Sequence, residues 1–284
     1  MGTEPMTAGE WLDLAARDLR EAGVEDPRRD AVLLLAHATG ADKGHILAHP
    51  EQILREEERS RADEFLRRRA SREPLQYILG VQEFWGLPVR VGPGCLIPRP
   101  ETEHLVEATL SVLKGRRAPA VAEVGTGSGC VLMALGAQRP DARLVGVERD
   151  IGALEWSRTN LAGMPRLILC RGDLEGASPL RDLDALVSNP PYIADEEWGE
   201  LQAEVRDFEP QEALRCGSEP LAPYRALTLW AARSLKPGGF LLCELGVAQA
   251  RRASALRRLH PALEWKGGIR DLAGRLRVGV WQRR

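Results

Sequence analysis

The residues with the most distinctive chemistry are Ser188-Asn189-Pro190-Pro191-Tyr192, which follow the apolar run 183–187. That run is typical of a buried strand, and two successive prolines end it because proline has no amide N–H. Each proline also favours an extended conformation in the residue before it. Asn189 and Pro190 are therefore predicted to form a stiff edge with an amide side chain, carbonyl oxygens and the Tyr192 ring. Rigid carbonyl acceptors suit a substrate that brings an NH2 group, although the stretch taken alone also fits a plain proline loop.

A second candidate site is the turn Glu123-Val124-Gly125-Thr126-Gly127-Ser128-Gly129, between a predicted strand and a predicted helix. Its glycines allow a tight turn and let a ligand approach the backbone closely. Glu148 lies 19 residues beyond Gly129 and ends the next predicted strand, where an acidic residue accepts hydrogen bonds from ribose hydroxyls. Asp173, after the third strand, can accept a hydrogen bond from an adenine amino group, with Leu174 packed on the base.

These positions fit two cofactors. NAD normally accompanies the spacing G-x-G-x-x-G, whereas the spacing here is G-x-G-x-G. S-adenosylmethionine also contains adenosine but has no pyrophosphate. A glycine turn without any ligand is the third interpretation.

Both stretches are placed by alternating strands and helices, which predict an α/β fold with a doubly wound sheet. In such sheets ligands bind at the carboxyl ends of the strands, where both stretches begin. A terminal pair of strands, 268–271 and 276–281, differs from the ending of a dinucleotide-binding domain. The other expected strands are 120–124, 143–147, 167–170, 184–188 and 240–244, and the expected helices are 130–138, 151–161, 224–235 and 248–259.

The first part of the chain is predicted to be helical. Thr7 and Glu10 have the spacing of a capping box before an apolar stripe that ends at Gly23. Further helices are expected from Asp26 to Gly40, around Ile46, and over 56–70. The segments 77–80 and 84–91 then predict a β-hairpin with glycine breaks. The loop Ile97-Pro98-Arg99-Pro100-Glu101-Thr102 is expected to be stiff and to lead into a helix. The predicted domains are a helical domain over 1–74, a hairpin linker over 75–97 and an α/β domain over 98–284.

The composition excludes several function classes. The charges of the 39 basic and 41 acidic residues nearly cancel. Neither residues 1–75 nor the remainder of the chain has the basic excess expected of a nucleic-acid-binding protein. Five scattered cysteines without a CxxC pair indicate reduced thiols in a cytoplasmic protein rather than a zinc site or disulfides. His45 and His49 have i, i+4 spacing but no third ligand, so no metal is expected. No apolar run is long enough to span a bilayer. The protein is expected to be a monomer.

The motifs together resemble those of class I, Rossmann-like S-adenosylmethionine methyltransferases. The loop Ile97–Thr102, the residues Tyr77-Ile78-Leu79-Gly80 and Glu83-Phe84-Trp85-Gly86, and Phe208-Glu209-Pro210 narrow the likeness to the PrmC/HemK family, the release factor glutamine methyltransferases. The likeness covers the chain from about residue 75 to the end, after a small helical domain. The family has Asp more often than Glu at position 123 and can have an aromatic residue at position 174. The stretch Glu219–Pro223 is also richer in proline than the family pattern.

The resemblance implies a function and a set of site residues. The substrate would be the glutamine of the Gly-Gly-Gln loop in class I peptide chain release factors, methylated on its side-chain amide nitrogen, N5. Asn189 and Pro190 would accept the two N–H groups of that amide, Tyr192 would pack on it, and the helical domain would recognise the release factor. The product would be S-adenosylhomocysteine. Catalysis and substrate binding are assigned to Asn189, Pro190, Pro191 and Tyr192, and cofactor binding to Glu123, Gly125, Thr126, Gly127, Ser128, Gly129, Glu148, Asp173, Leu174 and Asn189.

Two other function classes remain open. A nucleic-acid adenine N6-methyltransferase shares the Asn-Pro-Pro-Tyr motif but must flip its base, and the charge balance and the lack of an added target-recognition domain disfavour it. A non-catalytic binding module can have the same fold, and the intact motif disfavours it.

Overall fold

The computed structural model describes residues 5–174, 178 and 180–284. Within these residues the chain forms two compact units. The helical unit contains the chain up to Gly80 together with Gln202–Phe208, and the α/β unit contains Val81–Leu201 and Glu209–Arg284. The segment of residues 202–208 was not predicted to belong with the N-terminal helices. The sequence placed it inside the domain 98–284.

The helical unit is built on an apolar core supplied by amphipathic helices. Its largest fully buried side chain is Trp11, whose ring nitrogen donates to Asp63 Oδ1 at 2.7 Å. The predicted capping box of Thr7 and Glu10 is present at the start of the first helix, and Gly40 ends the second in the left-handed conformation. The helices of this unit are α1 (Ala8–Glu21), α2 (Pro27–Thr39), α3 (Lys43–Ala48), α4 (Glu56–Ala70), α5 (Leu75–Leu79) and α9 (Ala203–Phe208).

Helix α5 corrects the sequence prediction at one place. Residues 77–79 were expected to form one arm of a hairpin, but they are helical. Pro74 precedes the helix, and Gly80 ends it at φ 73, so a proline start and a glycine stop outweigh the strand preference of Tyr77 and Ile78. The hairpin itself is shorter and consists of β1 (Val81–Phe84) and β2 (Leu87–Arg90).

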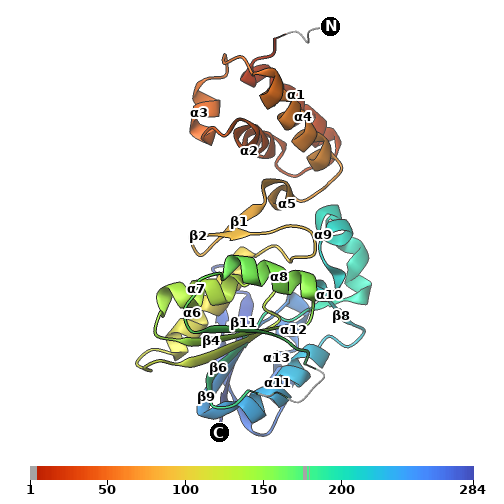
Figure 1. Cartoon of the computed structure of the whole chain (residues 1–284). Helices are drawn as coiled ribbons and strands as arrows, with labels where there is room; N and C mark the ends of the chain where they lie inside the picture. The colour runs from red at the N-terminus through yellow and green to blue at the C-terminus, as the bar shows by residue number, and fades with distance from the viewer. Residues whose placement is uncertain (1–4, 175–177, 179) are drawn as a thin grey trace. The chain divides into compact units, whose positions relative to one another are not determined.

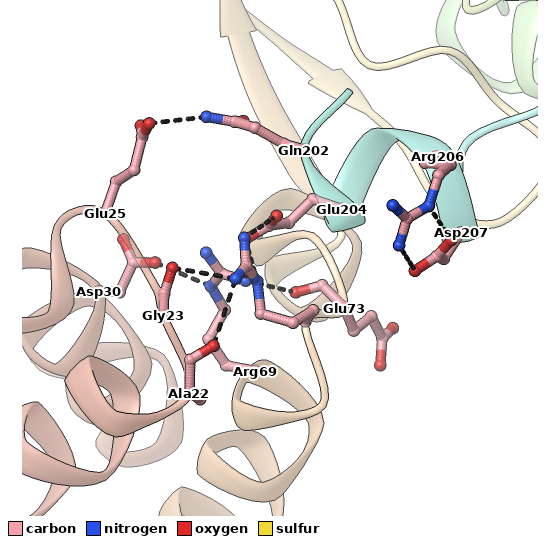
Figure 2. A network of polar contacts seen from close by, with 11 residues as sticks. Ala22, Gly23, Glu25, Asp30, Arg69, Glu73, Gln202, Glu204, Arg206 and Asp207 are labelled. Carbon is pink, nitrogen blue, oxygen red and sulfur yellow. Dashed lines mark hydrogen bonds and ion pairs between the residues drawn. The ribbon is translucent and has the colours of Figure 1, made fainter. Parts of the chain in front are cut away.

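A buried network of charged residues holds residues 202–208 in the helical unit. Arg69, on α4, bonds Asp30 Oδ2 through Nε at 2.8 Å and lies 2.9 Å from Glu204 Oε1 through Nη1. Arg72 adds a second, two-pronged contact to Glu204. Figure 2 shows Glu204 on the short helix α9 (Ala203–Phe208), with its carboxylate directed at the arginine side chains of this network. The side chains of Arg69 and Asp30 are only 7% and 8% exposed, so each charge depends on its partner for stability.

The α/β unit is organised around a seven-stranded mixed sheet. The strand order is β10-β11-β9-β6-β3-β4-β5, in which the β10–β11 and β11–β9 pairs are antiparallel and the other pairs are parallel. Helices α6, α7 and α8 lie on one side of the sheet, and α11 and α13 lie on the other (Figure 1). The strands are β3 (Ala120–Val124), β4 (Arg143–Glu148), β5 (Leu167–Arg171), β6 (Leu183–Ser188), β9 (Leu235–Glu244), β10 (Leu263–Arg270) and β11 (Leu276–Arg283). The helices are α6 (Glu103–Val112), α7 (Cys130–Gln138), α8 (Ile151–Asn160), α11 (Ala222–Ser234), α12 (Val247–Arg251) and α13 (Ala253–Leu256).

The predicted architecture is confirmed: a doubly wound sheet with an antiparallel ending, a helical N-terminal part and a β-hairpin. Two details of the prediction were wrong. The helix expected over 248–259 is two short helices, α12 and α13. The strand expected over 240–244 begins earlier, at Leu235, and its pairing with β6 shifts register between Leu183 and Ala185.

The segment between β6 and α11 was left without predicted elements. It contains the short pair β7 (Ile193–Ala194) and β8 (Arg215–Gly217), with η2 (Asp195–Glu200), α9 and α10 (Gln211–Leu214) between them. Residues Glu219–Pro223, whose prolines were noted in the sequence, lead into α11, with Pro223 in its first turn.

Candidate active site

The two candidate stretches meet at the point where the sheet changes direction. Strand β3 pairs in parallel with β4 on one side and with β6 on the other, so the loops after β3 and β6 leave the same edge as neighbours. This topological switch point is where open α/β sheets bind ligands. A Cβ on Gly125 would lie 4.0 Å from the carbonyl oxygen of Asn189. The glycine turn and the Asn-Pro-Pro-Tyr stretch are therefore adjacent.

The turn after β3 depends on its glycines. Gly125, Gly127 and Gly129 have φ values of 73°, 56° and 82°, a region that other residues rarely adopt. A Cβ on Gly127 would meet no atom within 4 Å, whereas one on Gly129 would lie 2.8 Å from Leu161. The middle of the turn therefore faces open space and leaves its backbone accessible.

The two hydroxyl residues of the turn stabilise its conformation. Thr126 and Ser128 are both 3% exposed, and Thr126 Oγ1 donates to the Val147 carbonyl at 3.3 Å. The carbonyl oxygens of Gly127 and Ser128 accept from Ser157 and Asn160 of α8. The backbone of the turn is consequently held in place before any ligand binds.

Glu148 lies at the end of β4, as the sequence predicted, and contacts the turn. Its Oε2 accepts from the Gly127 amide at 2.8 Å, and its Oε1 accepts from the amides of Arg149 and Asp150. A carboxylate oxygen can accept two hydrogen bonds, and among the described residues Oε2 accepts only one, from Gly127, so Glu148 can still receive a ribose hydroxyl through Oε2.

A cleft of about 540 Å³ opens beyond Glu148. Asp173 lies in its wall, with Oδ2 3.7 Å from Arg149 Nη1. Leu174 is partly buried and packs against the apolar core of the sheet. The other residues of the wall are Arg149, Asp150, Ile151, Arg171, Gly172 and Glu212.

Glu123 supplies an unsatisfied acceptor next to the turn. It is 2% exposed, and its Oε2 is buried without a hydrogen-bond partner. Burial, reinforced by the nearby charge of Glu148, raises the pKa of the Glu123 carboxyl well above its usual value. A buried acceptor without a donor fits a ligand that brings an amino group.

The Asn-Pro-Pro-Tyr stretch is anchored by Thr102, from the Ile97–Thr102 loop. Asn189 Nδ2 donates to Thr102 Oγ1 at 3.2 Å, and Thr102 is 3% exposed. The loop is itself held by Glu209, which accepts from the Ile97 amide at 3.0 Å and pairs with Arg99. The side-chain nitrogen of Asn189 is therefore engaged by Thr102. The side-chain oxygen, Oδ1, points away from that hydrogen bond.

Tyr192 lies with Asn189 on the wall of a small hollow completed by Leu96, Arg99, Ala213 and Leu214. Burial raises the pKa of the Tyr192 hydroxyl above its usual value, so the residue is a neutral hydrogen-bond donor. Its carbonyl oxygen accepts from Gln249 Nε2 at 2.9 Å.

Sequence reasoning did not single out two buried residues near the candidate site, Glu244 and Gln249. Glu244 ends β9 and is 3% exposed, and Gln249 is 0% exposed on α12. The signal was present: Glu244 is an acid at the carboxyl end of the apolar strand that follows Gly238-Gly239.

Comparison with known proteins identifies the family. Residues 10–80 match the PrmC N-terminal domain, and residues 103–206 match the methyltransferase small domain. The chain is 43% identical over 253 residues to the release factor glutamine methyltransferase of Geobacter sulfurreducens, covering 87% of each chain. The chain belongs to the release factor glutamine methyltransferase family. The enzyme of the same name from Rhodospirillum rubrum is 37% identical over 288 residues, covering 98% of this chain and 86% of that one.

The similar solved structures include one that is also named as a release factor-specific glutamine methyltransferase. The release factor-specific protein-(glutamine-N5) methyltransferase of Alicyclobacillus acidocaldarius is 27% identical, with a TM-score of 0.41, and the match covers 68% of this chain and 98% of that one. TrmN from Thermus thermophilus matches with a TM-score of 0.46 and 19% identity, covering 63% and 48%.

The described residues contain neither a candidate membrane-spanning helix nor a candidate metal-binding cluster. In residues 5–174, 178 and 180–284 no helix has the length and apolar character needed to cross a membrane. Over the same ranges no three His, Cys, Asp or Glu side chains are grouped so that they could hold a metal ion.

Proposed function

We propose that this family member transfers a methyl group from S-adenosylmethionine to N5 of the glutamine in the Gly-Gly-Gln motif of class I peptide chain release factors. The observation that carries the proposal is the placement of Asn189 beside the glycine turn, with its Nδ2 engaged by Thr102. Family membership supports the same substrate, because the curated relatives are named release factor glutamine methyltransferases.

The residues around the turn fit S-adenosylmethionine. Glu123 would accept from its amino group, the backbone of Gly125–Gly129 would lie along it, and Glu148 would accept from the ribose hydroxyls. Asp173 would accept from the adenine amino group in the cleft beyond Glu148, with Leu174 beside the base. When bound, the cofactor would supply an electrophilic methyl group.

The Asn-Pro-Pro-Tyr residues would orient the substrate amide. A glutamine amide nitrogen is a poor nucleophile because its lone pair is delocalised into the carbonyl group. Asn189 Oδ1 and the Pro190 carbonyl would each accept one N–H, which fixes the direction of the nitrogen lone pair. Pro191 would keep the Pro190 carbonyl rigid, and the Tyr192 ring would pack on the amide. Such orientation can lower a barrier by about 7–11 kcal/mol in favourable cases.

The helical unit is proposed to recognise the rest of the release factor. A single glutamine is a small target, so discrimination between proteins needs contacts elsewhere on the substrate. A short peptide that contains Gly-Gly-Gln should then have a much higher KM than the whole factor. Equal KM values for the peptide and the factor would contradict the recognition role.

The test of the proposed activity uses labelled S-adenosylmethionine and three acceptors. A purified class I release factor should take up label, whereas the same factor with its Gly-Gly-Gln glutamine changed to alanine should not. An adenine-containing DNA duplex is the third acceptor. Labelling of the duplex without labelling of the factor would support the adenine methyltransferase instead.

A further inference from the structure

Glu209 is a buried acid that holds one end of the loop Ile97–Thr102. Its side chain is only 1% exposed. The carboxyl oxygen Oε2 accepts from the Ile97 amide at 3.0 Å, and Oε1 pairs with the guanidinium group of Arg99. All of these residues belong to the α/β unit. One carboxyl group therefore holds the loop at two points, through its backbone and through a side chain.

The loop is stiff between Arg99 and Thr102. Pro98 and Pro100 have fixed φ angles, and Arg99, which precedes Pro100, is extended, with φ -101 and ψ 143. The Thr102 amide donates to the Arg99 carbonyl oxygen at 3.0 Å. Because the backbone between them has little freedom, the position of Thr102 follows from the position of Arg99.

The far end of the loop contacts the proposed substrate site. Thr102 Oγ1 accepts from Asn189 Nδ2 at 3.2 Å. Thr102 is 3% exposed, so water hardly competes for this hydrogen bond. The position of the loop therefore sets the position of the Asn189 amide.

Glu209 also joins two walls of the small hollow described above. One wall comes from the loop side, and the other comes from α10, which begins two residues after Glu209. The residues of the hollow are Leu96 and Arg99 on the loop side, Ala213 and Leu214 on α10, and Asn189 and Tyr192. The bonds from Glu209 to the loop therefore hold the two walls together around Asn189.

We propose that Glu209 is a positioning residue for methyl transfer, which holds the loop Ile97–Thr102 and thereby fixes the Asn189 amide where it meets the substrate NH2 group. Glu209 acts through the loop and needs no contact with the substrate. The role in methyl transfer rests on the proposed function. The position of Asn189 does not, because it is set by contacts within this chain.

The first test compares single-turnover rates of the full chain and Glu209→Gln. Glutamine keeps the shape of the side chain but replaces one acceptor oxygen with an NH2 group, which faces a donor at either Ile97 or Arg99. Leaving a buried donor unpaired should lower the rate roughly tenfold. Cofactor affinity and the KM for the release factor should be unchanged, because the glycine turn and the helical unit lie elsewhere.

Glu155→Gln is the matched control for this substitution. Glu155 also pairs with an arginine, Arg158, but its side chain is 60% exposed on α8. The rate of Glu155→Gln should equal that of the unmodified protein. A folded Glu209→Gln protein with an unchanged rate, or a loss that appears only in cofactor affinity, would overturn the proposal.

Two variants of Thr102 test the other end of the loop, and they decide the proposal even if Glu209→Gln does not fold. Thr102→Val removes the hydroxyl that accepts from Asn189 and should lower the rate, whereas Thr102→Ser keeps the hydroxyl and should retain most of it. The double variant of Glu209→Gln and Thr102→Val should be no slower than the slower single variant, since both act on Asn189 through one loop. A normal rate for Thr102→Val, or additive losses in the double variant, would contradict the proposal.

The second test needs no substrate and therefore separates this inference from the proposed activity. In ¹⁵N-labelled Glu209→Gln, the Ile97 amide should exchange with solvent faster than in the unmodified protein, and the side-chain NH2 signals of Asn189 should shift. Glu155→Gln should show neither change. Unshifted Asn189 signals in Glu209→Gln would refute the inference. Absence of methyl transfer by the unmodified protein, with the Asn189 shift present, would refute the proposed function alone.

Discussion

The side-chain nitrogen of Asn189 lies 3.2 Å from Oγ1 of Thr102, a residue 87 positions earlier in the chain. This contact joins the Ile97–Thr102 loop to the Asn-Pro-Pro-Tyr stretch at the edge of the sheet. It engages Nδ2 of the amide, which leaves Oδ1 for the proposed contact with the substrate.

Replacing Asn189 with alanine should therefore lower the rate of methyl transfer much more than cofactor affinity. Asn189→Ala removes the acceptor oxygen, and loss of one such contact costs about 3 kcal/mol, or roughly a hundredfold in rate. Asn189→Asp keeps an acceptor but removes the donor to Thr102 and adds charge, so its rate should be intermediate. Single-turnover rates and calorimetric affinities measure the two effects. A folded Asn189→Ala protein with near-normal rate would exclude the proposed role of Asn189.

Replacing Gly127 with valine should weaken cofactor binding at least tenfold in a folded protein. The position has φ 56 and open space around the added Cβ, so the fold loses about 1–2 kcal/mol from backbone strain while the side chain occupies the space above the turn. Gly115→Val is the matched control, because Gly115 has φ 80 and also meets nothing within 4 Å. Calorimetry should give at least a tenfold loss for Gly127→Val and none for Gly115→Val. Equal affinities would remove the turn from the site.

Gly246 lets the Tyr192 ring approach the end of β9. A Cβ at this position would lie 2.7 Å from Tyr192 Cδ2 and 2.6 Å from Gln249 Oε1, closer than atoms can pack. Gly246→Ala should therefore displace Tyr192 and lower the rate about tenfold or more. Gly199→Ala, whose Cβ would meet nothing within 4 Å, should leave the rate unchanged. If both variants behave alike, the position of Tyr192 is not set by Gly246.

The network around Arg69 should contribute strongly to the stability of the helical unit (Figure 2). Arg69→Ala leaves Asp30 and Glu204 buried without their shared cation, and breaking a buried ion pair costs about 3 kcal/mol. Arg67, on the same helix, has a side chain that is 74% exposed and pairs with the exposed Glu64, so Arg67→Ala should change stability by about 0.5 kcal/mol or less. Urea unfolding followed by circular dichroism compares the two variants. Similar urea midpoints for Arg69→Ala and Arg67→Ala would show that the Arg69 network does not stabilise the helical unit.

Much of the α/β unit could be predicted because its signals are local. The strand Ala120–Val124 and the helix Cys130–Gln138 have the predicted bounds, since an apolar run and a glycine turn mark both elements. The order of strands then brought Glu148 and Asn189 to the edge predicted for a ligand. The roles of the individual site residues stay predictions.

Other features depend on contacts between residues distant in sequence. Helix α9 is held by Glu204, whose partner Arg72 lies 132 residues earlier, and no local pattern in residues 202–208 indicates that pairing. The position of Glu244 at the same edge of the sheet as Asn189 follows from the parallel pairing of β6 and β9. Residues 77–79 were mispredicted because strand preference was weighed above Pro74 and Gly80, which mark the start and stop of a helix.

Fragmentation mass spectrometry of a treated release factor locates the transferred methyl group, which the proposed reaction places on N5 of one glutamine. After incubation with this protein and S-adenosylmethionine, the peptide that contains Gly-Gly-Gln should have one added methyl group on the glutamine side-chain amide. The Asn189→Ala protein should leave the same peptide largely unmodified under identical conditions. An unmodified glutamine with the unaltered protein, or a methyl group on another residue of the factor, would contradict the proposed function.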